Sequence, residues 1–306
     1  MQTTSHLLMI RPVHFTFNEQ TAVNNAFQTA TVDAETQTKA LKEFDDFVQT
    51  LSNNGVDVTV INDTVEPHTP DSVFPNNWIS FHNDGTILLY PMYAENRRQE
   101  RKPHVIENIK KKFSITNTID LTNYENNNLF LEGTGSMVLD RENNIAYACI
   151  SPRTDATVLE DFCKKMNYTA VLFSAVDANN ALIYHTNVMM CVANKYAVIC
   201  LDSIKNEAEK NAVIHSLEKT GKQIMTISYE QMNHFAGNML QVKNTDGEHL
   251  LVMSSQAFNA LTKEQVTLLQ GFNKIVHSSL TTIETNGGGS ARCMLAEVFL
   301  PINHSG

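Results

Sequence analysis

The stretch SMVLDRENNIAYACI (136–150), followed by LEDFCKKM (159–166) and YTAVLFSAV (168–176), decides the fold. Two apolar runs flank the polar turn DRENN, which is the pattern of a β-hairpin. LEDFCKKM carries apolar residues at helical spacing, and YTAVLFSAV is a third run of strand length. The order is therefore strand, strand, helix, strand, a ββαβ unit.

The same order of elements recurs along the chain. Helical stretches that run into strands are predicted at 41–61, before and through FSITNTIDL (113–121), at 159–176, at 213–228 and at 265–279. Hairpins are predicted at 78–91, 136–150, 188–201 and 239–253. Five copies at such intervals indicate an internal repeat. We therefore expect an α/β protein made of ββαβ modules, arranged around an axis.

A polar cluster precedes each hairpin. The clusters are PNN with Asn76 and Asn77, EGTG from Glu132, HTN from His185, AGN ending at Asn238, and GGGSARC (287–293) in the last copy. If the modules surround an axis, these clusters meet at one end of it, where a rigid frame can hold reactive side chains. Ordinary turns rich in Asn and Gly are the alternative explanation for any one cluster.

Cys293 follows three consecutive glycines in NGGGSARCML (286–295). Glycines allow positive φ and close approach of another molecule, so Cys293 is the candidate nucleophile. A buried packing cysteine is the alternative. A nucleophilic thiol needs a base and a group that orients it. His185 is the candidate general acid and base, and Glu132, set among apolar residues, is its candidate carboxylate partner, with a structural salt bridge as the alternative for Glu132.

Composition narrows the function further. The chain has 306 residues, 42% of them hydrophobic, and a formal net charge of −10. This charge argues against a nucleic-acid partner, and no apolar run approaches the ~18 residues of a membrane span. The five cysteines show no C-x-x-C spacing, so neither a disulfide framework nor a zinc site is expected. We expect a cytoplasmic enzyme without metal or organic cofactor, acting on a small molecule; a homo-oligomer is left open.

Five motifs in this order resemble the guanidino-group-modifying superfamily, closest to its citrulline-utilisation hydrolases. They are FLEGTGSMVLDR (130–141), SPRTD (151–155), YHTNVMM (184–190), AGNMLQV (236–242) and GGGSARCML (287–295). The resemblance implies the pentein fold, a five-bladed pseudo-fivefold α/β propeller, as a single catalytic domain over residues 1–306. It also implies that Cys293 is the nucleophile, His185 the acid and base, and Glu132 the partner of His185.

The resemblance implies substrate contacts as well. Arg153, in SPRTD, looks like the superfamily arginine that binds the α-carboxylate of the substrate, and Arg97 and Arg98 are further candidates. Asn238 is expected to shape the floor of the pocket. Backbone N–H groups from Gly289 to Cys293 are expected to stabilise the oxyanion.

Two asparagines depart from the deiminase pattern, in which a carboxylate binds the guanidinium. Asn77 and Asn187 stand at those positions. An amide both donates and accepts, which suits a neutral ureido group better than a cation. We therefore expect hydrolysis of citrulline to ornithine, carbon dioxide and ammonia through an S-carbamoyl enzyme.

Alternative functions stay open at this point. Carboxylates from other loops, such as Asp71, Glu125 or Asp155, would allow an arginine deiminase or a dimethylarginine hydrolase-like enzyme. An amidinotransferase differs only in the group that resolves the intermediate. A non-catalytic pentein that binds the ribosome is a further alternative, against which the joint presence of Cys, His and Glu argues.

Overall fold

The computed structural model describes residues 1–30 and 35–303. Within these residues the strands form five three-stranded sheets, each with one antiparallel and one parallel pairing. The first four, in chain order, are β3 (Ile79–Phe81), β4 (Thr86–Leu89) and β5 (Asn117–Asp120); β6 (Val138–Asp140), β7 (Ile145–Cys149) and β8 (Thr169–Phe173); β9 (Met190–Val192), β10 (Tyr196–Ile199) and β11 (Gln223–Thr226); β12 (Leu240–Lys243), β13 (His249–Ser254) and β14 (Lys274–Ser278). Each of these sheets contains a predicted hairpin and the strand predicted after the following helix.

The fifth sheet joins distant parts of the chain. It consists of β15 (Ala296–Glu297), β1 (His6–Arg11) and β2 (Asp57–Asn62). Strand β1 pairs antiparallel with β15 at Leu7 with Glu297 and Leu8 with Ala296, and it pairs parallel with β2. The sequence repeat predicted only the helix and the last strand of this unit.

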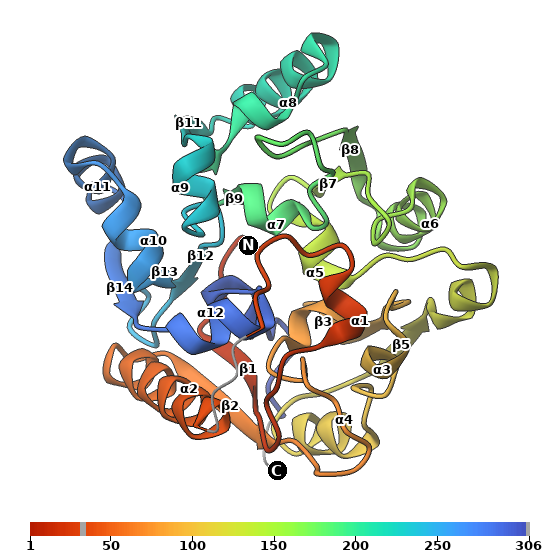
Figure 1. Ribbon diagram of the computed structural model, residues 1–306. Helices are drawn as coiled ribbons and strands as arrows, with labels where there is room; N and C mark the ends of the chain where they lie inside the picture. The colour runs from red at the N-terminus through yellow and green to blue at the C-terminus, as the bar shows by residue number, and fades with distance from the viewer. Residues whose placement is uncertain (31–34, 304–306) are drawn as a thin grey trace.

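A long helix precedes the last strand of each sheet. These helices are α2 (Thr36–Asn53), α4 (Pro103–Lys110), α6 (Ala156–Met166), α8 (Glu207–Lys219) and α11 (Lys263–Gln270), and they lie at the periphery of the molecule (Figure 1). In α2, Ala40, Phe44, Phe47 and Leu51 recur at helical spacing and are buried. Amphipathic helices of this kind cover one side of each small sheet.

Helix ends follow local sequence signals. The Asp155 side chain accepts hydrogen bonds from the N–H groups of Thr157 and Val158, which caps the start of α6. Asn167, with a φ of 56°, ends the same helix in the left-handed conformation. Together with the five mixed sheets, these helices confirm the predicted α/β class.

Short helical turns occupy the centre and the connections. They are α1 (Glu19–Ala22), η1 (Pro75–Asn77), α3 (Glu95–Arg98), η2 (Thr122–Asn127), α5 (Gly133–Ser136), α7 (Thr186–Met189), η3 (Leu201–Ser203), α9 (Tyr229–Asn233), α10 (Ser255–Ala260), α12 (Thr281–Gly287) and η4 (Ala291–Met294). Figure 1 shows α5, α7 and α12 near the middle of the molecule. Four of the predicted polar clusters thus form short turns, η1, α5, α7 and η4, each directly before a strand.

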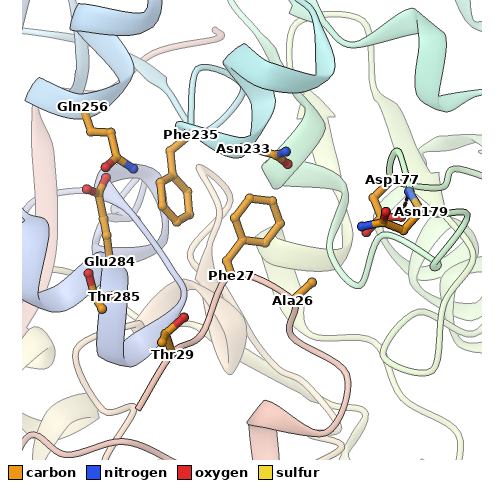
Figure 2. A pocket seen from close by; sticks show the side chains of 10 residues that line it. All are labelled: Ala26, Phe27, Thr29, Asp177, Asn179, Asn233, Phe235, Gln256, Glu284 and Thr285. Carbon is orange, nitrogen blue, oxygen red and sulfur yellow. Dashed lines mark hydrogen bonds between the residues drawn. The ribbon is translucent and has the colours of Figure 1, made fainter. Parts of the chain in front are cut away.

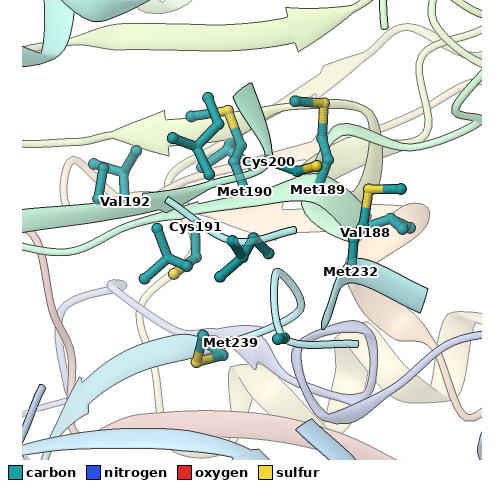
Figure 3. Close-up of a cluster of buried hydrophobic side chains, with 14 of the residues drawn as sticks. Val188, Met189, Met190, Cys191, Val192, Cys200, Met232 and Met239 are labelled. Carbon is teal, nitrogen blue, oxygen red and sulfur yellow. The ribbon is translucent and has the colours of Figure 1, made fainter. Parts of the chain in front are cut away.

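One buried cluster around the β9–β10 hairpin is rich in sulfur. Figure 3 shows Met189, Met190, Cys191 and Cys200 among its members. Burial raises the pKa of the Cys191 thiol to about 12 and that of Cys200 to about 11, so both remain neutral packing groups. All five cysteines are free thiols. Over residues 1–30 and 35–303, no helix has the length and apolar character that crossing a membrane requires.

Candidate active site

The glycines of the EGTG turn allow the polar clusters to pack closely. A Cβ atom at Gly135 would lie 2.4 Å from Asn77 Nδ2 and 2.8 Å from His185 Nδ1. A Cβ atom at Gly133 would lie 2.3 Å from the carbonyl oxygen of Asn76. Since real Cβ atoms do not approach so closely, only glycine lets η1, α5 and α7 meet.

Cys293 is buried in η4 and receives two amide donors. Asn187 Nδ2 lies 3.4 Å and Asn238 Nδ2 lies 3.3 Å from its Sγ atom. Asn238 is itself fixed, because its Nδ2 donates to the Asn187 carbonyl at 3.0 Å and its Oδ1 accepts from the Arg292 N–H at 3.0 Å. Asn187 Oδ1 has no hydrogen-bond partner among the described residues, so only the Asn238 amide is fixed on both sides. Two N–H donors at a sulfur suit a thiol that develops negative charge.

The glycine run before Cys293 has a specific backbone role. Gly288 has a φ of 64° and ends α12 in the left-handed conformation. Its carbonyl oxygen accepts from the Tyr184 hydroxyl at 2.6 Å and from Asn25 Nδ2 at 3.3 Å. The run therefore connects the cysteine turn to the residue before His185 and to the N-terminal segment.

Glu132 and His185 form a buried pair. His185 Nε2 lies 2.7 Å from Glu132 Oε2, while the Tyr93 N–H donates to Oε1 at 2.9 Å. Burial would raise the pKa of Glu132, but Arg153, 3.5 Å away, and the hydrogen bond with His185 outweigh it and hold that pKa at about 2. Glu132 is therefore a carboxylate at neutral pH.

His185 is neutral at the same pH. Burial lowers its pKa to about 4, with Arg153 and Arg97 adding to this effect and Glu132 opposing it. Because Nε2 is engaged by Glu132, it carries the proton of the neutral ring, and Nδ1 remains as the acceptor. A neutral imidazole with one fixed nitrogen is suited to take a proton from a nearby thiol.

A small cavity joins these residues. It is lined by Thr21, Asn25, Asp71, Phe74, Asn77, Arg97, Arg153, Tyr184, His185, Gly287, Gly288, Gly289 and Cys293. Its volume is about 10 Å³, which is room for about one water molecule. Thr21 and Asn25, from the segment around α1, form one wall.

The two lining arginines are engaged with protein groups. Arg153 stacks over the Tyr184 ring, with 4.9 Å between its Cζ atom and the ring centroid, and donates to Asn24 Oδ1 and the Thr21 carbonyl at 2.8 Å each. Arg97 donates to Asn77 Oδ1 at 2.8 Å and binds Glu100 with two further hydrogen bonds.

Other predicted contact residues lie elsewhere. Arg98 donates to the carbonyls of Met92 and Tyr93 and does not line the cavity. Asn187 and Asn238 touch the sulfur but are not among the cavity-lining residues, and Asn187 lines a separate cavity of about 20 Å³.

The structure limits the expected oxyanion donors. Gly289 lines the cavity, but the Cys293 N–H donates to the Ser290 carbonyl at 3.0 Å and the Arg292 N–H to Asn238. These two N–H groups are therefore engaged within the protein in this structure.

Asp71 is a site carboxylate that the sequence named only as an alternative. It is buried and lines the cavity, and its Oδ2 accepts from Asn18 Nδ2 at 2.8 Å and Thr21 Oγ1 at 3.0 Å. Its Oδ1 has no hydrogen-bond partner in the described part of the chain. Burial raises its pKa, against the opposing effect of Arg97. A buried carboxylate oxygen without a partner indicates a place for a ligand donor.

The other two carboxylates of that alternative have structural roles. Glu125 binds Arg101 at 2.7 Å, and Asp155 caps α6. Tyr184 and the residues around α1 were not predicted as site residues. The only sequence signal for Tyr184 is its position next to His185, and the α1 segment carries none.

A Cys–His–Glu constellation on an α/β frame of small mixed sheets defines the guanidino-group-modifying superfamily. The family model for N,N dimethylarginine dimethylhydrolase, eukaryotic, matches residues 11–300, and the chain belongs to this family. It is therefore an enzyme of a hydrolase family. No curated protein matches the chain in sequence.

Solved structures share the fold at low identity. The apo structure of ArgZ, an arginine dihydrolase of cyanobacteria, is 20% identical to this chain and has a TM-score of 0.75. The match covers 97% of this chain and 41% of the ArgZ chain. This chain thus spans less than half of that protein. The N-terminal domain of ArgZ bound to product has the same TM-score and identity and is covered over 98%. A dimethylarginine hydrolase of Pseudomonas aeruginosa, complexed with citrulline, is 14% identical with a TM-score of 0.66, covering 97% of this chain and 100% of that one.

Proposed function

We propose that this chain is a cysteine-dependent hydrolase that converts citrulline to ornithine, ammonia and carbon dioxide. We further propose that its five sheets are the blades of a five-bladed pseudo-fivefold α/β propeller, the pentein fold, and that residues 1–306 form one catalytic domain. The single observation that carries the substrate proposal is the orientation of the Asn77 amide.

Arg97 fixes that orientation. A guanidinium has only donors, so the atom of Asn77 that lies 2.8 Å from Arg97 NH1 must be the amide oxygen. The amide nitrogen then points the other way, with one N–H donated to Asn76 Oδ1 at 3.1 Å. Because Asn77 lines the cavity, we infer that its second N–H is the donor offered to a ligand there. A ureido carbonyl accepts from such a donor, whereas a guanidinium would bring another donor to it.

We assign the amino-acid end of citrulline to Asp71 and Arg153, which also line the cavity. Asp71 Oδ1, without a partner among the described residues, suits the α-ammonium group. Arg153 suits the α-carboxylate, since Asn24 Oδ1 accepts from both its Nε and NH2 in the closed structure. We infer that outward movement of the α1 segment exchanges Asn24 for the substrate carboxylate.

The first half-reaction forms a thiocarbamate. The neutral His185 takes the Cys293 proton at Nδ1 as sulfur attacks the ureido carbon. Glu132, ionised at neutral pH, stabilises the imidazolium that forms. The C–N bond to the ornithine side chain then breaks, and His185 returns the proton to the departing nitrogen. The products of this step are ornithine and S-carbamoyl Cys293.

The second half-reaction hydrolyses the thiocarbamate. Neutral His185 takes a proton from water, which attacks the carbamoyl carbon, and the Cys293 sulfur departs and regains a proton. Carbamate leaves and decomposes to ammonia and carbon dioxide. Asn187 and Asn238 stabilise the sulfur in both halves through their N–H groups.

A second candidate is hydrolysis of arginine. The observation that favours it is Asp71, because one buried carboxylate in the cavity could also pair with a guanidinium. ArgZ, which shares the fold, is an arginine dihydrolase, in keeping with this alternative. Cys293 is the nucleophile in both candidates. They differ in whether the substrate that enters the site is citrulline or arginine.

One assay separates them. Purified protein is incubated with citrulline or arginine, each carbon-13 labelled at the ureido or guanidino carbon, and the amino acids and labelled carbon dioxide are measured. We expect ornithine and labelled carbon dioxide from citrulline. Turnover of arginine without any turnover of citrulline would replace this proposal with the second candidate. The Cys293→Ala variant is the blank, and activity in that blank would remove the nucleophile.

A further inference from the structure

A second cavity lies beside the active site and is about 320 Å³ in volume, within the range of small-molecule sites. Figure 2 shows Phe27 and Phe235 in its middle, with Glu284 and Gln256 on one side and Asp177 on the other. None of these residues belongs to the cavity that contains Cys293. The catalytic proposal therefore leaves this cavity unexplained.

Glu284 is the most unusual group in this cavity. It is 3% exposed, and its Oε1 accepts from the Ser290 hydroxyl at 2.6 Å. Its Oε2 has no hydrogen-bond partner anywhere in residues 1–30 and 35–303. Burial raises the pKa of this carboxyl group against the opposing effects of Ser254 and Ser290. A buried carboxyl oxygen without a partner is costly unless a donor is supplied, and Glu284 is one of the residues that line this cavity.

The two phenylalanine rings provide an apolar and electron-rich surface next to it. Their centroids are 5.1 Å apart and their planes are inclined by 41°. Phe235 has a φ of 61°, in the left-handed region that bulky residues rarely adopt. This backbone conformation holds its ring in the cavity. Aromatic faces attract organic cations and also pack against methylene chains.

Asp177 lies at the far side of the rings from Glu284 (Figure 2). Its Oδ1 accepts from the N–H groups of Asn179 and Ala181 at 2.8 and 2.9 Å, which fixes the carboxylate at the rim. The cavity thus has a carboxylate on each side and aromatic rings between them. This order matches a linear molecule with a positive charge at each end and an aliphatic middle.

We propose that this cavity binds a linear aliphatic diamine. One ammonium group donates to Glu284 Oε2, the methylene chain lies along Phe27 and Phe235, and the second ammonium group faces Asp177. The described residues contain no cluster of three His, Cys, Asp or Glu side chains suited to a metal ion, and two phenylalanines are poor metal neighbours.

The position of this site couples it to the catalytic residues. Ala26, Phe27 and Thr29 line it, and they continue the segment whose Thr21 and Asn25 close the catalytic cavity. On the other side, the carbonyl of Ser290, the residue bonded to Glu284, accepts from the Cys293 N–H. A bound diamine would therefore contact the segment that follows α1 directly, and it would be linked to the Cys293 turn through Glu284 and Ser290.

Calorimetric titration with 1,4-diaminobutane tests the proposal. We expect one site per chain, binding at least about tenfold weaker in Glu284→Gln, and no binding of the uncharged 1,4-butanediol. Butylamine, with one charge, should bind several-fold more weakly than the diamine. Asp71→Asn is the matched control, since it removes a carboxylate from the catalytic cavity only, and it should bind the diamine like the wild type.

Several results would overturn the proposal. The proposal would fail if the diamine did not bind, or if the wild type and Glu284→Gln bound it with equal affinity. It would also fail if Asp71→Asn lost binding, because that result would place the amine in the catalytic cavity. Equal affinity for butylamine would overturn the two-ended binding mode. Circular dichroism checks the fold of each variant. If Glu284→Gln does not fold, Phe27→Ala at the half-buried ring replaces it and should weaken binding as well. These outcomes do not depend on whether citrulline is the substrate.

Discussion

Replacement of Asn77 by Asp should change the preferred substrate from a ureido to a guanidino compound. In the wild type, Asn77 Oδ1 accepts from Arg97 NH1 at 2.8 Å, so the amide nitrogen is the atom left for the ligand. In Asn77→Asp the oxygen bonded to Arg97 is retained, while the donor becomes a second carboxylate oxygen. The hydrogen-bonding character of one atom is thus reversed. The bond that this atom donates to Asn76 Oδ1 is lost for either substrate, so its loss cancels in the ratio of the two activities.

The size of the effect follows from two hydrogen bonds. Citrulline loses the donor to its carbonyl, which costs about 1–3 kcal/mol when the group is left unpaired. Arginine gains a hydrogen bond to a charged acceptor, worth about 1.5–3 kcal/mol. Since about 1.4 kcal/mol is a factor of ten, the ratio of kcat/KM for arginine to that for citrulline should rise by at least about 60-fold.

The assay measures kcat/KM for both substrates with wild type, Asn77→Asp and Asn76→Asp. Asn76→Asp makes the same change one residue earlier, where the side chain donates to Thr134 Oγ1 and does not line the cavity. The oxygen of Asn76 that accepts from Asn77 Nδ2 is kept in this variant, so the Asn77 amide keeps its orientation. Asn76→Asp should leave the substrate preference unchanged. An unchanged ratio in Asn77→Asp, or an equal change in Asn76→Asp, would refute the argument from the amide orientation.

Three further predictions test the same site. Cys293→Ala should abolish ornithine release at unchanged thermal stability within about 1 kcal/mol, and residual turnover above the buffer blank would contradict the nucleophile; circular dichroism gives the stability. Burial lowers the pKa of His185 from its ordinary value near 6.5 to about 4, so between these two pH values the unfolded chain binds a proton that the native chain does not. The free energy of unfolding should therefore decrease as the pH is lowered through this window, by up to about 3 kcal/mol. Urea unfolding of wild type and His185→Gln at pH 7 and pH 4.5 checks this, and equal losses in both would show that His185 is not responsible. Gly135→Ala should reduce kcat by at least about tenfold, since its Cβ would meet His185 Nδ1 at 2.8 Å; Gly247→Ala, with open space around it but a φ of 87°, is a control for strain alone and should retain kcat.

The ββαβ repeat predicted most of the fold, because its helices and hairpins are encoded by local sequence patterns. Helices such as α2 and hairpins such as β6 with β7 are encoded by periodicity over a few residues. The fifth sheet was not predicted in full because β15 is only two residues, Ala296–Glu297, and its partner β1 lies almost a chain length away. A pairing at that separation leaves no periodic signal.

The site residues also divide into those that a local sequence pattern encodes and those that depend on long-range contacts. Cys293, His185 and Glu132 occupy equivalent positions in the repeat, so the sequence could predict their meeting. Arg97 and Arg98 could not be separated from sequence: consecutive residues of α3 point about 100° apart, and only Arg97 faces the cavity. Asp71 enters the cavity through the contacts of its loop with Asn18 and Thr21, which no local pattern encodes.

The pairing of β1 with β15 has a consequence for folding. Only two residues separate Cys293 from β15, so the proposed nucleophile lies next to a sheet that forms only when residues 6–11, 57–62 and 296–297 have come together. Contacts of such high sequence separation form late and slowly. The four hairpin modules can fold as local units before this happens. The thiol should therefore become competent in the last stage of folding, and cysteine reactivity toward a substrate analogue should lag behind the recovery of helical circular dichroism during refolding.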